Sequence, residues 1–398
     1  MSKKFFSLKL SQISDVIAGQ SPESNYYSNV EGVPFLQGNR TFGSLYPTID
    51  SYTSKVTKWA KKGDVLMSVR APVGDLNIAP CDLCIGRGLA SIRARNGNNK
   101  FIYYALKYNI RTLLRQGSGT TFDSVNKDVI NKFELIIPQE PLERLKVSKV
   151  LSALDSKIEL NQRINTELES MARTLYHYWF VQFDFPNEKG KPYKSAGGEM
   201  VWNEALKREI PLGWEVGELS DIANITMGQS PPGESYNDDG EGKIFFQGCT
   251  DFGNRFPSVR QFTTQPTRFA KEGDILLSVR APVGTINIAK EACCIGRGLA
   301  ALNSKNNTVT YLLEVMRNLK QVFDRRNVNG TTFGSITKDD LFSLKVVKPE
   351  KKVLGEYQKT IYPTFEKQNR LELESQMLTE LRDWLLPMLM NGQVRVTG

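Results

Sequence analysis

The chain has 398 residues, of which 40% are hydrophobic, and it carries a formal net charge of +9. This length and composition indicate a folded protein of two or three domains and exclude a disordered polymer. The start, MSKKFFSLKLSQISD, has charges where a signal peptide needs an apolar core, and no apolar run is long enough to cross a membrane. Five cysteines are too few for a disulfide framework, so we expect a cytoplasmic protein. The positive charge favours a polyanionic partner.

Residues 1–140 have the pattern of a mostly β domain. Segments such as GDVLMSVRAPVGDLNIAP, residues 63–80, are short and rich in β-branched residues, and Gly, Pro and Asn interrupt them. That pattern is typical of strands joined by turns.

Residues 141–185 are rich in Leu, Glu, Lys and Gln, which favours a long helix. Spacings of four and three alternate along a heptad seam that contains two polar positions: Leu154, Ile158, Asn161, Asn165, Leu168, Ala172, Leu175 and Trp179. After a polar connector, residues 186–209, and a second β-rich stretch, residues 210–349, a second helix is predicted in 350–398. Its comparable stripe consists of Ile361, Phe365, Gln368, Leu371, Leu378 and Leu385. Since an apolar seam needs a partner, we expect the two helices to pair.

The two β-rich stretches are copies of each other. SVRAPVG occurs at residues 68–74 and again at 278–284, an offset of 210 residues. CIGRGLA, at residues 84–90 and 294–300, keeps the same offset. The duplication predicts two similar domains with internal pseudo-two-fold symmetry, a covalent equivalent of a homodimer.

The whole chain resembles the specificity (S) subunit of type I restriction-modification systems. The most specific stretches are LDSKIELNQRINTELESMARTLYHYWFVQFDFP (154–186), LRDWLLPMLMNGQV (381–394) and IPLGWEVGELSDIA (210–223). The resemblance implies an α+β fold in which a pair of long antiparallel coiled-coil helices holds two mostly β target-recognition domains apart. It also implies a subunit that reads double-stranded DNA, with no catalytic site, cofactor or metal of its own.

The partners implied by the resemblance are two methylation subunits and, in the full complex, restriction subunits. The methylation subunits bring S-adenosylmethionine and modify adenine, and the restriction subunits bring ATP and magnesium for translocation and cleavage. In this family the two recognition domains usually differ, whereas here they are close copies. Two similar domains related by a two-fold axis require two similar half-sites, so we predict a nearly palindromic bipartite target.

The residues argue against an enzyme. His177 is the single histidine, so neither a Ser-His-Asp triad nor a histidine-rich metal site can be assembled. The motifs of a phosphate-binding loop and of an adenine methyltransferase are absent as well. A free-standing two-domain DNA-binding regulator remains an alternative, distinguished by tight binding to DNA without partner subunits.

Two pairs of arginines hold matching places in the repeat. Arg70 and Arg280 lie where an apolar strand enters the Ala-Pro-Val-Gly turn, and Arg87 and Arg297 each lie between two glycines. A guanidinium there is suited to a bidentate contact with guanine or to a phosphate. An ion pair within the domain, or a clamp on backbone carbonyls, accounts for them equally well.

Three further sets are candidates. Gln37 and Gln247 are suited to adenine if they point outward. Hydroxyl donors that suit phosphates or base edges, or else cap turns, are Thr120, Thr121, Thr331 and Thr332. Scattered charges suited to phosphates, or simply to solvent, are Arg40, Lys55, Lys58, Lys61, Lys62, Arg255, Arg260, Arg268 and Lys271.

Aromatic residues crowd the ends of the predicted helices. They are Tyr176, Tyr178, Trp179 and Phe180 in the first helix and Trp384 in the second. Aromatic side chains are enriched at protein interfaces, so this cluster is a candidate contact with a methylation subunit. Packing of the helix ends against the recognition domains is the alternative.

Overall fold

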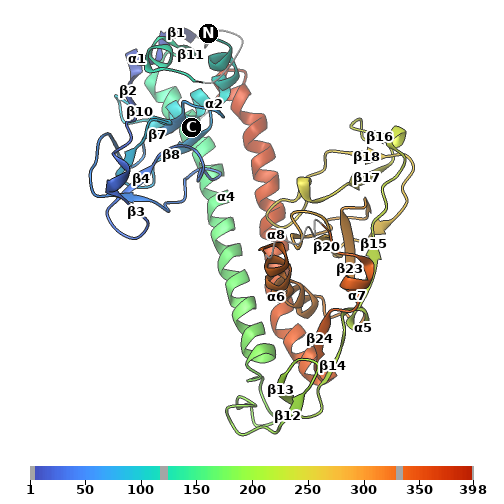
Figure 1. Ribbon diagram of the computed structural model, residues 1–398. Helices are drawn as coiled ribbons and strands as arrows, with labels where there is room; N and C mark the ends of the chain where they lie inside the picture. Colours follow the sequence, from blue (N-terminus) through green and yellow to red (C-terminus); the bar gives the residue numbers. More distant parts are fainter. Residues whose placement is uncertain (1–4, 117–123, 329–334, 397–398) are drawn as a thin grey trace. The chain divides into compact units, whose positions relative to one another are not determined.

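The computed structural model of the chain describes residues 5–116, 124–328 and 335–396 (Figure 1). The chain divides into two compact units, each of which is described by itself. Unit 1 consists of Met1–Leu160 with Ser375–Gly398, and unit 2 consists of Asn161–Glu374. The candidate threonines Thr120, Thr121, Thr331 and Thr332 lie outside the described residues.

The described part of unit 1 contains three sheets. The first pairs β1 (Phe5–Lys9) with β11 (Glu134–Pro138). The second has the order β2 (Ser14–Ala18), β10 (Leu89–Ala94), β7 (Val65–Ser68) and β8 (Leu76–Ile78). The third has the order β3 (Tyr27–Ser28), β5 (Tyr52–Thr53), β4 (Val33–Leu36), β9 (Leu83–Ile85) and β6 (Trp59–Ala60). Apart from the two long helices described below, the α-helices of unit 1 are α1 (Leu10–Ile13), α2 (Asn99–Gln116) and α3 (Lys127–Lys132).

Strand β7 explains why the sequence shows a continuous apolar run there instead of an alternation. Val65 and Met67 belong to the core that α2 covers, whereas Leu66 belongs to a second cluster with Leu83 and Ile85 of β9. The strand is therefore buried on both faces, and each face needs apolar side chains.

Unit 2 repeats this topology. β14 (Glu215–Glu218) pairs with β24 (Lys345–Lys348), and the four-stranded sheet has the order β15 (Ala223–Met227), β23 (Leu299–Ser304), β20 (Ile275–Ser278) and β21 (Ile286–Ile288). The five-stranded sheet has the order β16 (Tyr236–Asn237), β18 (Phe262–Thr263), β17 (Lys243–Phe246), β22 (Cys293–Ile295) and β19 (Phe269–Ala270). The hairpin of β12 (Met200–Asn203) and β13 (Arg208–Pro211) precedes them, and the helices are α5 (Leu219–Ile222), α6 (Val309–Val328) and α7 (Lys338–Phe342).

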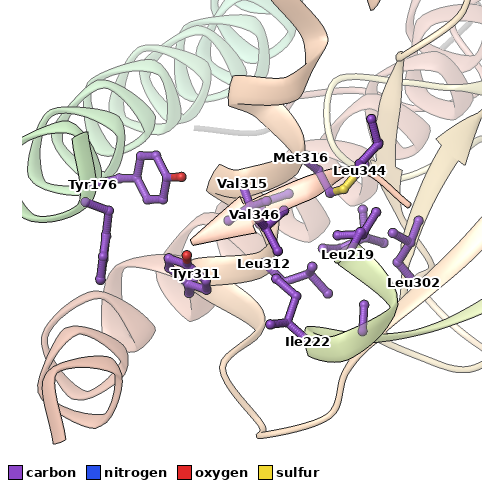
Figure 2. Packing of buried hydrophobic residues seen from close by; sticks show 14 of the residues in the cluster. Tyr176, Leu219, Ile222, Leu302, Tyr311, Leu312, Val315, Met316, Leu344 and Val346 are labelled. Atoms are coloured by element: carbon purple, nitrogen blue, oxygen red, sulfur yellow. The ribbon is translucent and has the colours of Figure 1, made fainter. Parts of the chain in front are cut away.

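The core of unit 2 forms where α6 covers the four-stranded sheet. Figure 2 shows Leu312, Val315 and Met316 of α6 beside Leu219 of α5 and Leu302 of β23. The two copies also match in register, because β4 and β9 pair in parallel through Phe35 and Cys84 as β17 and β22 do through Phe245 and Cys294. The duplication in the sequence is thus a duplication of fold.

The two predicted long helices are α4 (Pro141–Tyr176), which continues as a π-helical turn over His177–Val181, and α8 (Lys351–Met390). In unit 2 they run antiparallel, since Asn161 Nδ2 donates to Glu374 Oε2 at 2.8 Å and Gln368 Nε2 donates to the Asn165 carbonyl at 3.3 Å. The polar positions of the seam therefore set the register of the pair. None of the described helices combines the length and apolarity needed to cross a membrane.

Candidate nucleic-acid interface

In unit 1, parallel strands β4 and β9 bring two candidate residues together. Gly86 N donates to the Leu36 carbonyl at 2.8 Å, and Gly88 N donates to the Gln37 carbonyl at 3.0 Å. A Cβ added to Gly88 would lie 2.6 Å from the Gln37 carbonyl oxygen, which is too close for any residue with a side chain. The glycines beside Arg87 are therefore required by a close approach within the domain itself. The Arg87 side chain remains exposed.

Arg70 comes to the same place from β7. The turn that follows is closed by Ser68, whose Oγ donates to the Pro72 carbonyl at 2.8 Å, and by Gly74, whose φ of +97° favours glycine. Arg70 also forms an isolated β-bridge with Ser124. The backbone at Arg70 is thus held on two sides while its side chain is exposed.

These side chains line one pocket. Gln37, Arg70 and Arg87 share a pocket of about 440 Å³ with Arg40 and Asp50. Among the described residues, the Arg70 and Arg87 guanidinium groups have no hydrogen-bond or ion-pair partner, and neither does the Gln37 side chain. The ion pair and the carbonyl clamp that would give these arginines a structural role are therefore not found in the described part of unit 1. Unpaired guanidinium groups beside an exposed amide are the donors that base edges and phosphates accept.

Unit 2 repeats the backbone but not every side-chain contact. Gly298 N donates to the Gln247 carbonyl at 3.1 Å, and Arg280 forms an isolated bridge with Ser335. Arg280 and Arg297 are exposed, and their guanidinium groups also lack partners within the described residues. Gln247 differs from Gln37, because its amide exchanges hydrogen bonds of 2.9 and 3.1 Å with Ser230 Oγ. To contact adenine, the Gln247 amide must break its hydrogen bonds with Ser230.

The scattered charges divide into three groups. Lys55, Lys58, Lys62, Arg268 and Lys271 are exposed and remain candidates for phosphate contacts. Three others form ion pairs on the surface: Arg40 with Asp50, Lys61 with Asp82, and Arg260 with Asp251.

Arg255 is the exception, and the prediction of a phosphate contact for it is wrong. Its side chain is buried against α8, where Nε donates to Asn369 Oδ1 and Nη1 donates to Gln368 Oε1 at 3.2 Å. Its guanidinium carbon also lies 4.7 Å from the centre of the Phe365 ring. Burial, together with the positive charge of Arg317, lowers the pKa of Arg255 to about 10. Arg255 therefore holds the β-rich domain of unit 2 against α8.

Most of the aromatic cluster at the end of α4 is core. Tyr176, Trp179 and Phe180 are buried, and the Phe180 ring lies 4.7 Å from that of Tyr311 and 4.9 Å from that of Tyr357. Figure 2 shows Tyr176 next to Tyr311. Their burial leaves no surface for a partner subunit, so packing of the helix end against the domain accounts for these three residues.

Two aromatic residues remain accessible. Tyr178 is 37% exposed in unit 2, and Trp384 is 56% exposed in unit 1. Only these two of the five aromatic candidates are open to a partner in the free chain.

Sequence reasoning did not single out Asp50, which lies in the wall of the unit 1 pocket. A signal was present, because the aligned position in the second copy is Arg260, of opposite charge.

Comparison with known proteins gives the family. A family model described as the type I restriction modification DNA specificity domain matches residues 3–170 and 211–382. The chain belongs to this family. It is 33% identical over 323 residues to a Methanocaldococcus jannaschii protein that carries the name MjaX specificity subunit of a type I restriction enzyme, covering 78% of this chain and 72% of that relative. It is 26% identical to the MjaIX specificity subunit of the same organism, covering 98% and 93% of the two chains.

A solved structure shows the same fold. The S subunit of a type I restriction-modification system from M. genitalium superposes with a TM-score of 0.63 at 17% identity, covering 99% of this chain and 97% of that chain. Type I specificity subunits are non-catalytic, and this one accordingly recognises DNA rather than acting on it.

Proposed function

We propose that this specificity subunit binds a split double-stranded DNA target and directs adenine methylation or restriction by its partner subunits. The observation that carries the proposal is the duplicated site: Arg70 and Arg87 in one unit and Arg280 and Arg297 in the other are exposed and, among the described residues, unpaired. Guanidinium groups held on a rigid backbone can contact guanine or grip phosphates. Because the two scaffolds match, we propose half-sites that are similar and inverted.

The proposed division of labour follows the chain. Residues 1–140 and 210–349 are the recognition domains, 141–185 and 350–398 the spacer helices, and 186–209 the connector. Two methylation subunits with S-adenosylmethionine complete the methyltransferase, and restriction subunits bring ATP and magnesium. Tyr178 and Trp384 are offered as contacts for the methylation subunits, because aromatic side chains exposed in the free chain are typical of interfaces. Five cysteines that form no disulfide support action in the cytoplasm.

Selection of duplexes tests this function. The chain assembled with a methylation subunit from the same source is incubated with a library of random duplexes, and the bound fraction is sequenced. We expect enrichment of one split motif whose halves are separated by a fixed spacer. Enrichment of no motif, or of a contiguous one, contradicts the proposal. Tight, selective binding by the chain without partner subunits favours a free-standing regulator instead.

A further inference from the structure

The loops that follow β4 and β17 have the same backbone but different charges. Residues 37–51 in unit 1 align with 247–261 in unit 2, at the offset of 210. Four hydrogen bonds fix the alignment in matched pairs: Thr48 N to Thr41 O (2.9 Å) with Ser258 N to Asp251 O (2.8 Å), and Phe35 N to Ser51 O (2.9 Å) with Phe245 N to Gln261 O (2.9 Å). Differences between these loops therefore lie in their side chains.

Each loop carries one ion pair, and the order of the two charges along the chain is reversed. In the first loop the arginine comes before the aspartate, and in the second loop it comes after it. In unit 1 the Arg40 guanidinium donates from Nη2 to Asp50, at 2.9 Å to Oδ1 and 2.7 Å to Oδ2. In unit 2 the Arg260 guanidinium donates from Nε to Asp251 Oδ1 at 2.9 Å. Positions 50 and 260 are aligned, so a carboxylate in the first copy stands where a guanidinium stands in the second.

Exposure decides which charge each loop presents to a ligand. In unit 1 the Arg40 side chain is 76% exposed and Asp50 is 42% exposed, so both groups are accessible. In unit 2 Arg260 is 69% exposed, but Asp251 is only 11% exposed. Unit 1 thus presents a donor and an acceptor, whereas unit 2 presents a donor alone, from the position that Asp50 occupies in unit 1.

Stability does not explain the Arg40–Asp50 pair, because both side chains are exposed and such pairs contribute little to folding. The location of this pair points to recognition. Arg40 and Asp50 line the same pocket as Gln37, Arg70 and Arg87. They therefore lie beside the three candidate residues that are identical in the two copies. A base held against the shared residues would have this pair as its neighbour.

We propose that the two ion pairs make the recognition domains read different bases at one position of otherwise matched half-sites. Carboxylates accept a hydrogen bond from cytosine N4, and guanidinium groups donate to guanine O6 and N7. The half-site of the first domain therefore has cytosine opposite Asp50, and the half-site of the second domain has guanine opposite Arg260. The inference rests on the proposed function and deepens it, since it makes the target a palindrome broken at one defined position.

The test replaces three residues of the first loop with the residues at the aligned positions of the second loop. The variant R40T/T41D/D50R gives unit 1 the side chains found at residues 250, 251 and 260. Duplex selection with the assembled complex compares it with the wild type and with Lys132→Ala, an exposed residue that does not line the pocket. We expect the variant to convert one base of the first half-motif to the base of the second, with at least tenfold preference for the converted duplex. The second half-motif stays unchanged, and so does the motif selected by Lys132→Ala.

Three results would overturn the inference. They are wild-type halves that are identical at every position, a rewritten variant that selects the wild-type motif, and a change spread over both halves. If the triple variant fails to fold, Asp50→Ala removes the carboxylate that would accept a hydrogen bond from cytosine N4. Asp50→Ala is expected to lose the cytosine preference at one position, and retention of that preference counts against the inference. A wild-type complex that selects no split motif refutes the proposed function itself, so the two failures are distinguishable.

Discussion

Arg382 of α8 donates from Nη1 to Asp155 Oδ1 of α4 at 2.7 Å, inside unit 1. Both side chains are almost buried, and the Tyr104 hydroxyl donates to the other carboxylate oxygen of Asp155. The contact therefore ties both long helices to α2 of the first recognition domain.

Asp155→Asn should destabilise the protein strongly. Removing one charge from a buried ion pair costs up to about 3–5 kcal/mol, and here it leaves Arg382 with only Asp383, which is 53% exposed, as its ion-pair partner. Chemical denaturation with a probe in unit 1 measures the loss. Glu215→Gln, which breaks an exposed ion pair with Lys348 in unit 2, is the control and should cost about 1 kcal/mol or less. Equal losses would mean that the Arg382 contact does not fasten the helices.

Arg255→Leu should loosen the second recognition domain. The first copy has Leu45 at the aligned position, but in unit 2 the substitution leaves Asn369 and Gln368 facing an apolar side chain. Buried polar groups without partners cost about 1–3 kcal/mol each, so thermal melting should shift downward by several degrees. Arg260→Ala, an exposed arginine of the same domain, is the matched control. A melting temperature unchanged by Arg255→Leu would refute the docking role.

Tyr357 and Tyr311 form a matched pair for a hydroxyl test. Among the described residues the buried Tyr357 hydroxyl has no hydrogen-bond partner, whereas the Tyr311 hydroxyl donates to the Val347 carbonyl at 2.7 Å. Tyr357→Phe should therefore stabilise unit 2 by about 1 kcal/mol, and Tyr311→Phe should destabilise it by a similar amount. Urea unfolding of both variants decides. Destabilisation by Tyr357→Phe would show that its hydroxyl is satisfied in solution.

Stability should fall as the pH rises above 10. Burial raises the pKa of Tyr176, Tyr311 and Tyr357 above their ordinary value of 10.0, so above that pH the unfolded chain releases protons that the folded chain retains. Arg255, with its pKa lowered to about 10, contributes the opposite sign, as do Arg144, Arg208 and Lys107, whose pKa values burial also lowers. Burial raises the pKa of Tyr103 and Tyr104 as well, so the buried phenols predominate. Urea midpoints from pH 8 to 11, with phenolate absorbance followed in parallel, measure the slope. A midpoint that rises above pH 10 would contradict this balance.

Removing Arg70 and Arg280 together should weaken DNA binding in both half-sites. A bidentate contact of arginine with guanine contributes about 1–3 kcal/mol, so the double alanine variant should bind its selected duplex at least about tenfold more weakly. The double alanine variant of Lys58 and Arg268 is a matched control. These two residues are aligned and exposed, and replacing them removes the same amount of positive charge. If both double variants lose equal affinity, the arginines serve only as general positive charge.

The repeat and the heptad seam made most of the architecture predictable. Each copy of SVRAPVG ends in the same turn, and the seam residues Asn161 and Gln368 do meet the partner helix. The helices α2 and α6 were not predicted, because the short strands before them dominate the pattern of each domain.

The site was predictable only in part. Arg70 and Arg87 share a pocket because β4, β7 and β9 converge there, and the repeat marked both residues. The burial of Arg255 and Phe180 depends on contacts with α8 and α6, which lie far away in the sequence. A basic or aromatic residue has the same letter whether it faces DNA, a partner or the core, so only the tertiary contacts separate these roles.

The most direct measurement of the central claim is a map of N6-methyladenine in cells that express this chain with its methylation subunit. The account predicts methylation confined to one split motif whose inverted halves match except at one position. Methylation absent while the two subunits copurify, or present at a contiguous motif, would contradict it.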